Sequence, residues 1–201
     1  MSTIPLTGSQ TVGPFFAPAL LREDARRNVL TRPETVGERI RIEGRVLDGD
    51  GVPVPDAMVE IWQANAHGRY NHPADQGSAP LDPSFLGFGR AGTAEDGSYW
   101  FETVKPGSVA FDGERFQAPH ICVTVFSRGL LNHLVTRLYF EDEPTNAFDP
   151  VLQCVPNDRR ATLLARRAPS INRGATADGT AVVYRFDIVL QGEGETAFFN
   201  V

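Results

Sequence analysis

Apolar side chains recur at every second position in several short stretches of this chain. Ile40, Ile42 and Val46 alternate with polar residues before the glycine-rich turn 48–51, and an apolar run resumes at 58–64. A period of two is the repeat of a β-strand that buries one face. Both stretches are therefore predicted to be strands.

Further predicted strands share this period of two, and they are 98–104, 121–127, 135–141 and 182–191. Glycine and proline punctuate the chain from Gly44 to Gly107, which is typical of antiparallel sheets. The segment 157–167 (NDRRATLLARR) predicts a short peripheral helix that begins at Asn157. We expect an all-β fold, a single-domain β-sandwich over residues 39–201.

Residues 1–38 lack the apolar periodicity of a second core. Gly13, Pro14 and Pro18 interrupt this segment, and 20–30 has room for a helical turn or two. We expect an N-terminal arm that packs on its own domain or on a neighbouring subunit.

Charge and composition exclude several classes of protein. A net charge of -6 with scattered arginines argues against a nucleic-acid partner. No apolar run approaches the roughly 20 residues of a membrane span, and the N-terminus lacks a basic region followed by an apolar one. Cys122 and Cys154 have no CxxC spacing, so reduced thiols are expected. We expect a cytoplasmic protein.

Side chains able to bind metals concentrate between residues 66 and 133, and they are His67, Tyr70, His72, His120, Cys122 and His133. Their spacing matches no common zinc site, so spacing alone favours surface or core histidines over a metal site. On the strand 121–127, His120 shares a face with Cys122 and Thr124. Arg128 follows in a turn, where its guanidinium is either solvated or available to a carboxylate. Serine-hydrolase, phosphate-loop and dinucleotide motifs are absent from the sequence.

The segment 55–64 (PDAMVEIWQA), followed by Gly-Arg-Tyr at 68–70, resembles the signature of intradiol ring-cleaving dioxygenases. Other segments similar to this family follow in its order, at 81–85, 89–90, 96–99, 105–107, 119–121 and 137–140. The two ends, 10–15 and 185–196, are similar to the protocatechuate branch of the family. This resemblance implies a β-sandwich and the cleavage of an aromatic ring by O2.

The family's Fe(III) is held by two tyrosinates and two histidines, and only half of this set is matched here. Tyr70 matches the first tyrosine and His120 the first histidine. Val109 and Cys122 stand at the other two ligand positions, and Gln117 replaces the arginine that precedes the histidine pair. The resemblance therefore implies a vestigial pocket without a metal.

The resemblance also implies a homologous β subunit that binds the Fe(III). In such pairs the metal-free chain walls its partner's pocket, and the positions that match this wall are Thr11, Gly13, Pro14, Phe15 and Arg128. The implied substrates are a small aromatic acid and O2. Two alternatives remain at this point: a homomeric Fe(III) enzyme whose site is completed by residues such as Tyr99 and His133, and a non-catalytic β-sandwich binding module.

Overall fold

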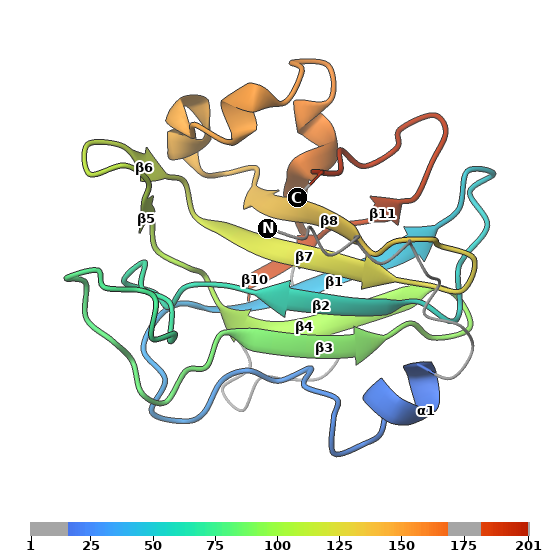
Figure 1. Ribbon diagram of the computed structural model, residues 1–201, viewed down its shortest axis with the longest axis horizontal. Helices are drawn as coiled ribbons and strands as arrows, with labels where there is room; N and C mark the ends of the chain where they lie inside the picture. The colour runs from blue at the N-terminus through green and yellow to red at the C-terminus, as the bar shows by residue number, and fades with distance from the viewer. Residues whose placement is uncertain (1–15, 169–181, 201) are drawn as a thin grey trace, which may run out of the picture.

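Two packed β layers make up this chain, as seen in a computed structural model whose described residues are 16–168 and 182–200 (Figure 1). The expected wall residues Thr11, Gly13, Pro14 and Phe15 lie outside these ranges. The strands are β1 (Arg39–Leu47), β2 (Met58–Trp62), β3 (Phe88–Gly92), β4 (Ser98–Val104), β5 (Val109–Ala110), β6 (Phe116–Gln117), β7 (His120–Phe126), β8 (Leu134–Phe140), β9 (Leu164–Ala168), β10 (Val182–Arg185) and β11 (Ile188–Val189). The helical segments are α1 (Phe16–Leu20) and the 3-10 turns η1 (Pro144–Phe148), η2 (Leu152–Cys154) and η3 (Arg160–Leu163). The predicted all-β sandwich is confirmed.

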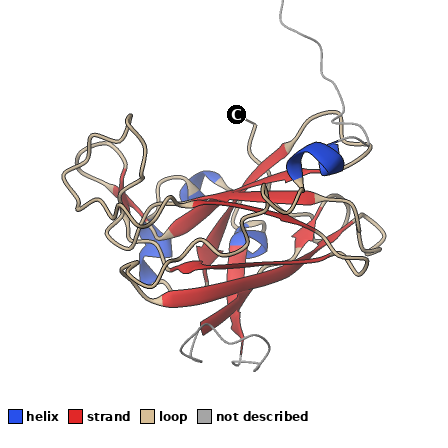
Figure 2. Cartoon of the chain, turned by 90° about the horizontal axis from the view of Figure 1, so that it is seen from below, coloured by secondary structure: helices blue, strands red, loops and turns tan. Residues whose placement is uncertain are grey.

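Nine strands of the described part of the chain belong to one curled sheet. One layer is antiparallel and runs β3-β2-β7-β8, and the other contains β9, β10 and β1, with β4 and β11 also paired to β1 (Figures 1 and 2). A short parallel pairing, Tyr139 with Leu164 and Phe140 with Ala165, links the two layers. The short β5–β6 hairpin stands apart from this sheet.

The core fills the space between the layers with the apolar rows that the sequence predicts. Ile40 and Ile42 of β1 are 0% and 1% exposed, and Ile121, Val123 and Val125 of β7 are at most 1% exposed. Burying each such side chain stabilises the fold by about 1.5–3 kcal/mol. The opposite face of β7 carries His120, Cys122 and Thr124, as the alternation predicts.

The helix predicted over 157–167 is wrong. Only the 3-10 turn η3 forms there, and the chain then enters strand β9 at Leu164. Leu163 and Ala165 are both fully buried, and Ala165 pairs with Phe140 of β8. Tertiary pairing therefore overrides the local helical preference. The predicted strand 182–191 also divides into β10 and β11, and between them Arg45 N bonds the side-chain Oδ1 of Asp187 (2.9 Å) and not a backbone carbonyl.

The described residues that precede β1 lie along β3 and β4. After α1, one turn is closed by Arg26 N bonding Arg22 O at 2.9 Å. Isolated bridges then pair Arg27 with Arg90 and Val29 with Glu102. This stretch packs on its own domain, which was one of the two expected positions for the arm. In the residues with described structure, we find no helix long and apolar enough to cross a membrane.

Candidate functional site

Three side chains from β7 and the loop after β2 converge at one end of the sheet. The Tyr70 hydroxyl lies 3.4 Å from Nε2 of His120, and the thiol of Cys122 lies beside the same hydroxyl. Cys122 pairs with Trp62 across the β2–β7 ladder. The Trp62 ring in turn stacks on the Tyr70 ring, with centroids 5.7 Å apart and planes at 20°. The structure therefore assembles the predicted positions Tyr70, His120 and Cys122.

Two loops in close contact hold Tyr70 and Val109 at this end. Gly68 has φ +80°, and a Cβ on it would lie 1.9 Å from the backbone oxygen of Ser108. The side-chain oxygen of the buried Asn65 accepts from the amides of His67 (2.9 Å) and Arg69 (3.1 Å). Glycine is required at 68 because this φ and this approach exclude a side chain.

His120 is held in one orientation by the backbone. Its ring is 1% exposed, and Nδ1 lies 2.8 Å from the carbonyl oxygen of Ala118, so Nδ1 carries the proton and donates. Nε2 is then an acceptor that faces Tyr70. Burial, and secondarily the charge of Arg137, lower the pKa of His120 to about 4. The ring is therefore neutral at physiological pH.

A polar network behind His120 was not identified from the sequence. Arg137 Nη1 donates to Gln117 Oε1 at 2.6 Å and lies 3.4 Å from the Tyr139 hydroxyl. Tyr139 donates to Asp149 Oδ1 (3.0 Å), and the buried Asp149 also accepts from Ala118 N (2.7 Å). This carboxylate therefore fixes the backbone that orients His120. One sequence feature that could have indicated this network is the period of two, which places Arg137 and Tyr139 on one face of the predicted strand 135–141.

The donor set does not fit Fe(III). Val109 pairs with Gln117 in the β5–β6 hairpin and offers no donor atom. Burial raises the pKa of Tyr70, and the neighbouring Cys122 raises it further, so the phenol stays protonated. Burial likewise raises the pKa of the Cys122 thiol. A hard trivalent cation prefers anionic oxygen ligands, and at the four ligand positions only the Tyr70 phenol can become one.

The residues proposed for a homomeric site do not meet this cluster. The Tyr99 hydroxyl donates to Phe186 O at 2.6 Å within the core. His133 lies beside Phe126, with ring centroids 5.5 Å apart, at the opposite end of β7. The suggestion that they complete the site is wrong. Of the other histidines, His72 meets the edge of Trp62, and His67 lines the cavity described next.

A cavity of about 510 Å³ opens over the Tyr70 cluster. Its walls combine the apolar side chains of Trp62, Val109 and Phe116 with the polar or charged side chains of His67, Arg69, Tyr70, His72 and Asp75. Phe116 is 62% exposed on the β5–β6 hairpin. Tyr70 and Val109, two of the positions matched to family ligands, line this cavity directly.

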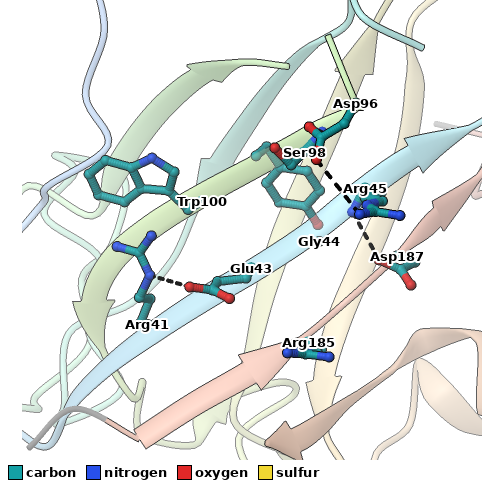
Figure 3. A pocket seen from close by; sticks show the side chains of 10 residues that line it. Arg41, Glu43, Gly44, Arg45, Asp96, Ser98, Trp100, Arg185 and Asp187 are labelled. Carbon is teal, nitrogen blue, oxygen red and sulfur yellow. Dashed lines mark hydrogen bonds and ion pairs between the residues drawn. The ribbon is translucent and has the colours of Figure 1, made fainter. Parts of the chain in front are cut away.

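A second hollow, of about 640 Å³, lies over β1 and β4 (Figure 3). Its charged side chains are largely neutralised by one another: Arg41 bonds Glu43 (2.5 Å) and covers the Trp100 ring (4.3 Å), while Arg45 lies 3.6 Å from Asp96. None of the site residues predicted from the sequence lines this hollow.

Arg128 lies at the opposite end of β7 from His120. Eight residues of extended chain separate them, or about 26 Å at roughly 3.3 Å per residue. Arg128 is 63% exposed, and its Nε donates to Asp56 Oδ2. Leu21, just after α1, packs against Gly92 at this same end, where a Cβ would lie 2.9 Å from it. Arg128 therefore cannot reach the pocket of its own chain.

Comparison with known proteins gives the family of this chain. The family model described as "Dioxygenase" matches residues 11–192. Over the full length of both proteins, this chain is 44% identical to the protocatechuate 3,4-dioxygenase alpha chain of Burkholderia cepacia. It is 41% identical to the beta chain from that organism, over 96% of this chain and 78% of the relative.

Solved structures of related proteins share the fold. A dioxygenase domain from Streptomyces sp. SirexAA-E is 26% identical, with a TM-score of 0.60 over 94% of this chain and 97% of the other. The 3-chlorocatechol 1,2-dioxygenase of Rhodococcus opacus 1CP has a TM-score of 0.63 at 20% identity, over 94% and 69% of the two chains. Sequence match, fold and site geometry agree, and this chain belongs to the dioxygenase family.

Proposed function

We propose that this chain is the α subunit of a protocatechuate 3,4-dioxygenase. The observation that carries the proposal is the separation of its functional parts: the vestigial cluster lies at one end of β7, and Arg128 lies at the other. If Arg128 contacts substrate, the substrate must therefore be bound in another chain. The identity to both alpha and beta chains of Burkholderia cepacia supports a homologous β subunit as that chain.

The proposed reaction is the intradiol cleavage of 3,4-dihydroxybenzoate by O2 to 3-carboxy-cis,cis-muconate. The C–C bond between the two hydroxyl-bearing carbons breaks, and both atoms of O2 enter the product. The β subunit holds the Fe(III) that supplies the redox chemistry. The present chain supplies enclosure and charge, through Arg128 and the arm residues Thr11, Gly13, Pro14 and Phe15. We place this complex in the cytoplasm.

The contacts of Arg128 suit this role. Asp56 engages Nε, which leaves the outer nitrogens of the guanidinium available to a carboxylate. A fixed positive charge at the mouth of a pocket raises the local concentration of an anionic substrate. Holding the side chain in advance also lowers the entropy lost when the substrate binds.

Iron content and visible absorption test the proposal. The chain is expressed alone and together with its β subunit, and tyrosinate-to-Fe(III) charge transfer is followed. Colour and ring cleavage are expected only in the mixed complex. A lone chain that is coloured, loaded with one iron and active would overturn the proposal in favour of a homomeric enzyme.

A further inference from the structure

We propose that the cavity over Tyr70 is a metal-free binding site for a small aromatic carboxylate. This goes beyond the proposed function, because it adds a second ligand site to the αβ complex, and it does not depend on the role of Arg128. Three features of the cavity support this ligand: two arginines that lack a carboxylate partner, nearby carboxylates that are already engaged, and an apolar wall that suits a flat ring.

Arg69 lines the cavity, and one of its nitrogens lacks a hydrogen-bond partner. The side chain is half-buried, and its Nη1 donates to Ala79 O at 2.9 Å. Its Nε is buried and has no partner in the part of the chain that the structure describes. A buried charged donor without a partner is costly, and a bound ion is a common explanation for one. Arg69 is therefore the first indication that the cavity takes an anion.

Arg137 brings a second positive charge to the former ligand positions. It stands opposite Cys122 in the β7–β8 ladder, and its Nη1 bonds only the neutral oxygens of Gln117 (2.6 Å) and Tyr139 (3.4 Å). Burial raises the pKa of Tyr70 and of Cys122, and the charge of Arg137 opposes both rises. The guanidinium therefore lies close to both side chains, at the floor of the cavity.

The carboxylates near these two arginines are engaged elsewhere. Asp75 accepts from the amides of Tyr70 (2.8 Å) and Gly77 (2.8 Å). The fully buried Asp149 accepts from the Tyr139 hydroxyl and from three backbone amides. Neither carboxylate and neither arginine belongs to any ion pair between residues of described structure. The partner that the two guanidinium groups lack is therefore an anion from outside the chain.

The apolar wall of the cavity favours an anion that carries a flat ring. Trp62, Val109 and Phe116 line it, and Trp62 stacks on Tyr70 with ring centroids 5.7 Å apart. Aromatic rings pack on one another in offset or edge-to-face contacts. The volume of about 510 Å³ is in the range of roughly 300–1,000 Å³ of small-molecule sites. An aromatic carboxylate has both the charge and the ring, whereas an inorganic anion would leave the apolar wall in contact with water.

The amount of ligand bound by the αβ complex tests this site. The probe is radiolabelled 4-hydroxybenzoate, an aromatic carboxylate that lacks the second hydroxyl needed for intradiol cleavage and is therefore not consumed. Equilibrium dialysis gives the total ligand bound per αβ pair, and the change in tyrosinate-to-Fe(III) absorption reports the iron site alone. We expect two molecules per pair at saturation, of which only one follows the change in colour.

Two substitutions locate the second molecule. Arg69→Gln and Arg137→Gln are each expected to weaken its binding about tenfold to a hundredfold, because one charge-assisted contact is lost. The matched control is Arg45→Gln, in the separate hollow over β1 and β4, which should leave it unchanged. Binding at the iron site, read from the colour, should stay within about twofold in all three variants, because that site is distant.

One molecule per αβ pair, all of it coupled to the colour, would overturn the proposal. A second molecule whose affinity is the same in wild type, Arg69→Gln and Arg137→Gln would overturn it as well. Neither result touches the proposed function, because the iron site is followed independently by its absorption.

Discussion

The Tyr70 hydroxyl lies 3.4 Å from Nε2 of His120, farther than the 2.7–3.2 Å of a strong hydrogen bond. Both groups are neutral, since burial raises the pKa of Tyr70 and lowers that of His120 to about 4. Tyr70 and His120 therefore stand at two of the four ligand positions implied by the family resemblance, and neither side chain is charged. Val109 and Cys122 stand at the other two ligand positions implied by the family resemblance, so they are the first positions to change in a test of iron binding.

Restoring those two positions is expected to give the chain an iron site. Val109→Tyr with Cys122→His supplies a second phenol and a second imidazole, and the cavity of about 510 Å³ beside Val109 has room for the ring. The αβ complex of this variant should gain up to one further Fe(III) per pair, measured by metal analysis and charge-transfer absorption. Each single substitution is the control and should leave the iron content at the wild-type value. Unchanged iron in the double variant would show that Gln117 or Arg137 also blocks the site.

The buried His120 predicts acid-sensitive stability. Its pKa is about 4 in the folded chain against 6.5 for an unperturbed histidine, so the unfolded chain binds the proton more tightly. The stabilising contribution of the neutral ring is therefore complete above pH 6.5 and is lost as the pH falls toward 4. The loss reaches about 3 kcal/mol in the acid limit. Denaturant unfolding gives the unfolding free energy of wild type and of His120→Gln across pH 4–7. The contribution of His120 is the difference between the slopes of the two free energies against pH.

The matched control for this titration is His133→Gln, because His133 is exposed and lies at the other end of β7. Because this variant keeps His120, the acid-dependent loss of stability that His120 contributes should persist in it. If His120→Gln follows that dependence as well, then His120 titrates normally and the burial argument is wrong.

Arg128→Ala is expected to weaken substrate binding without affecting the metal. Loss of one charge-assisted contact costs about 1.5–3 kcal/mol, so KM for the anionic substrate should rise about tenfold or more in the αβ complex. The iron content should stay at the wild-type value, because Arg128 binds no ligand of the metal. Arg45→Ala, at another exposed arginine that pairs with Asp96 at 3.6 Å, is the control. Coincident kinetics for wild type and Arg128→Ala would refute the role of Arg128.

Asp56 partly neutralises Arg128, so Asp56→Asn is expected to strengthen substrate binding. Asparagine keeps an oxygen that accepts from Arg128 Nε but removes the negative charge. A partly exposed charge is worth up to about 1 kcal/mol, so KM should fall by no more than about fivefold at low salt. The gain should disappear in about 1 M salt, where charges are screened within about 3 Å. It should also vanish in the double variant with Arg128→Ala, and a gain that survives there would assign the effect to another residue.

Strands with two distinct faces could be predicted from the sequence, and β4 was predicted to the residue at Ser98–Val104. Strand β3 was missed because Gly89 and Gly92 have the composition of a turn. In the fold, a Cβ on Gly89 would lie 2.9 Å from Leu30 and 3.0 Å from the ring of Phe101 on β4, in the other layer. The glycine is there for close packing between layers, which is a tertiary requirement that local pattern does not report.

The site residues likewise fall into two groups, those that the sequence predicts and those that only the fold reveals. Tyr70, His120 and Cys122 were placed together by family resemblance, and their alternation on β7 supported this placement. The network of Gln117, Arg137, Tyr139 and Asp149 joins residues 10 to 31 positions apart in the chain. No periodic pattern links Asp149 to the strand that it supports, so only the fold reveals it.

Gly68→Ala is expected to destabilise the chain and to move Tyr70. The left-handed φ of +80° costs an alanine about 1 kcal/mol, and its Cβ would lie 1.9 Å from the rigid backbone oxygen of Ser108. Since the loops must separate to relieve this overlap, the total loss should be about 2–4 kcal/mol. The control is Gly51→Ala, with φ +76° and no heavy atom within 4 Å of the new Cβ, for which only about 1 kcal/mol should be lost. Denaturant midpoints measure both changes, and equal losses would mean that the contact between the 67–69 and 107–108 loops does not set the position of Tyr70.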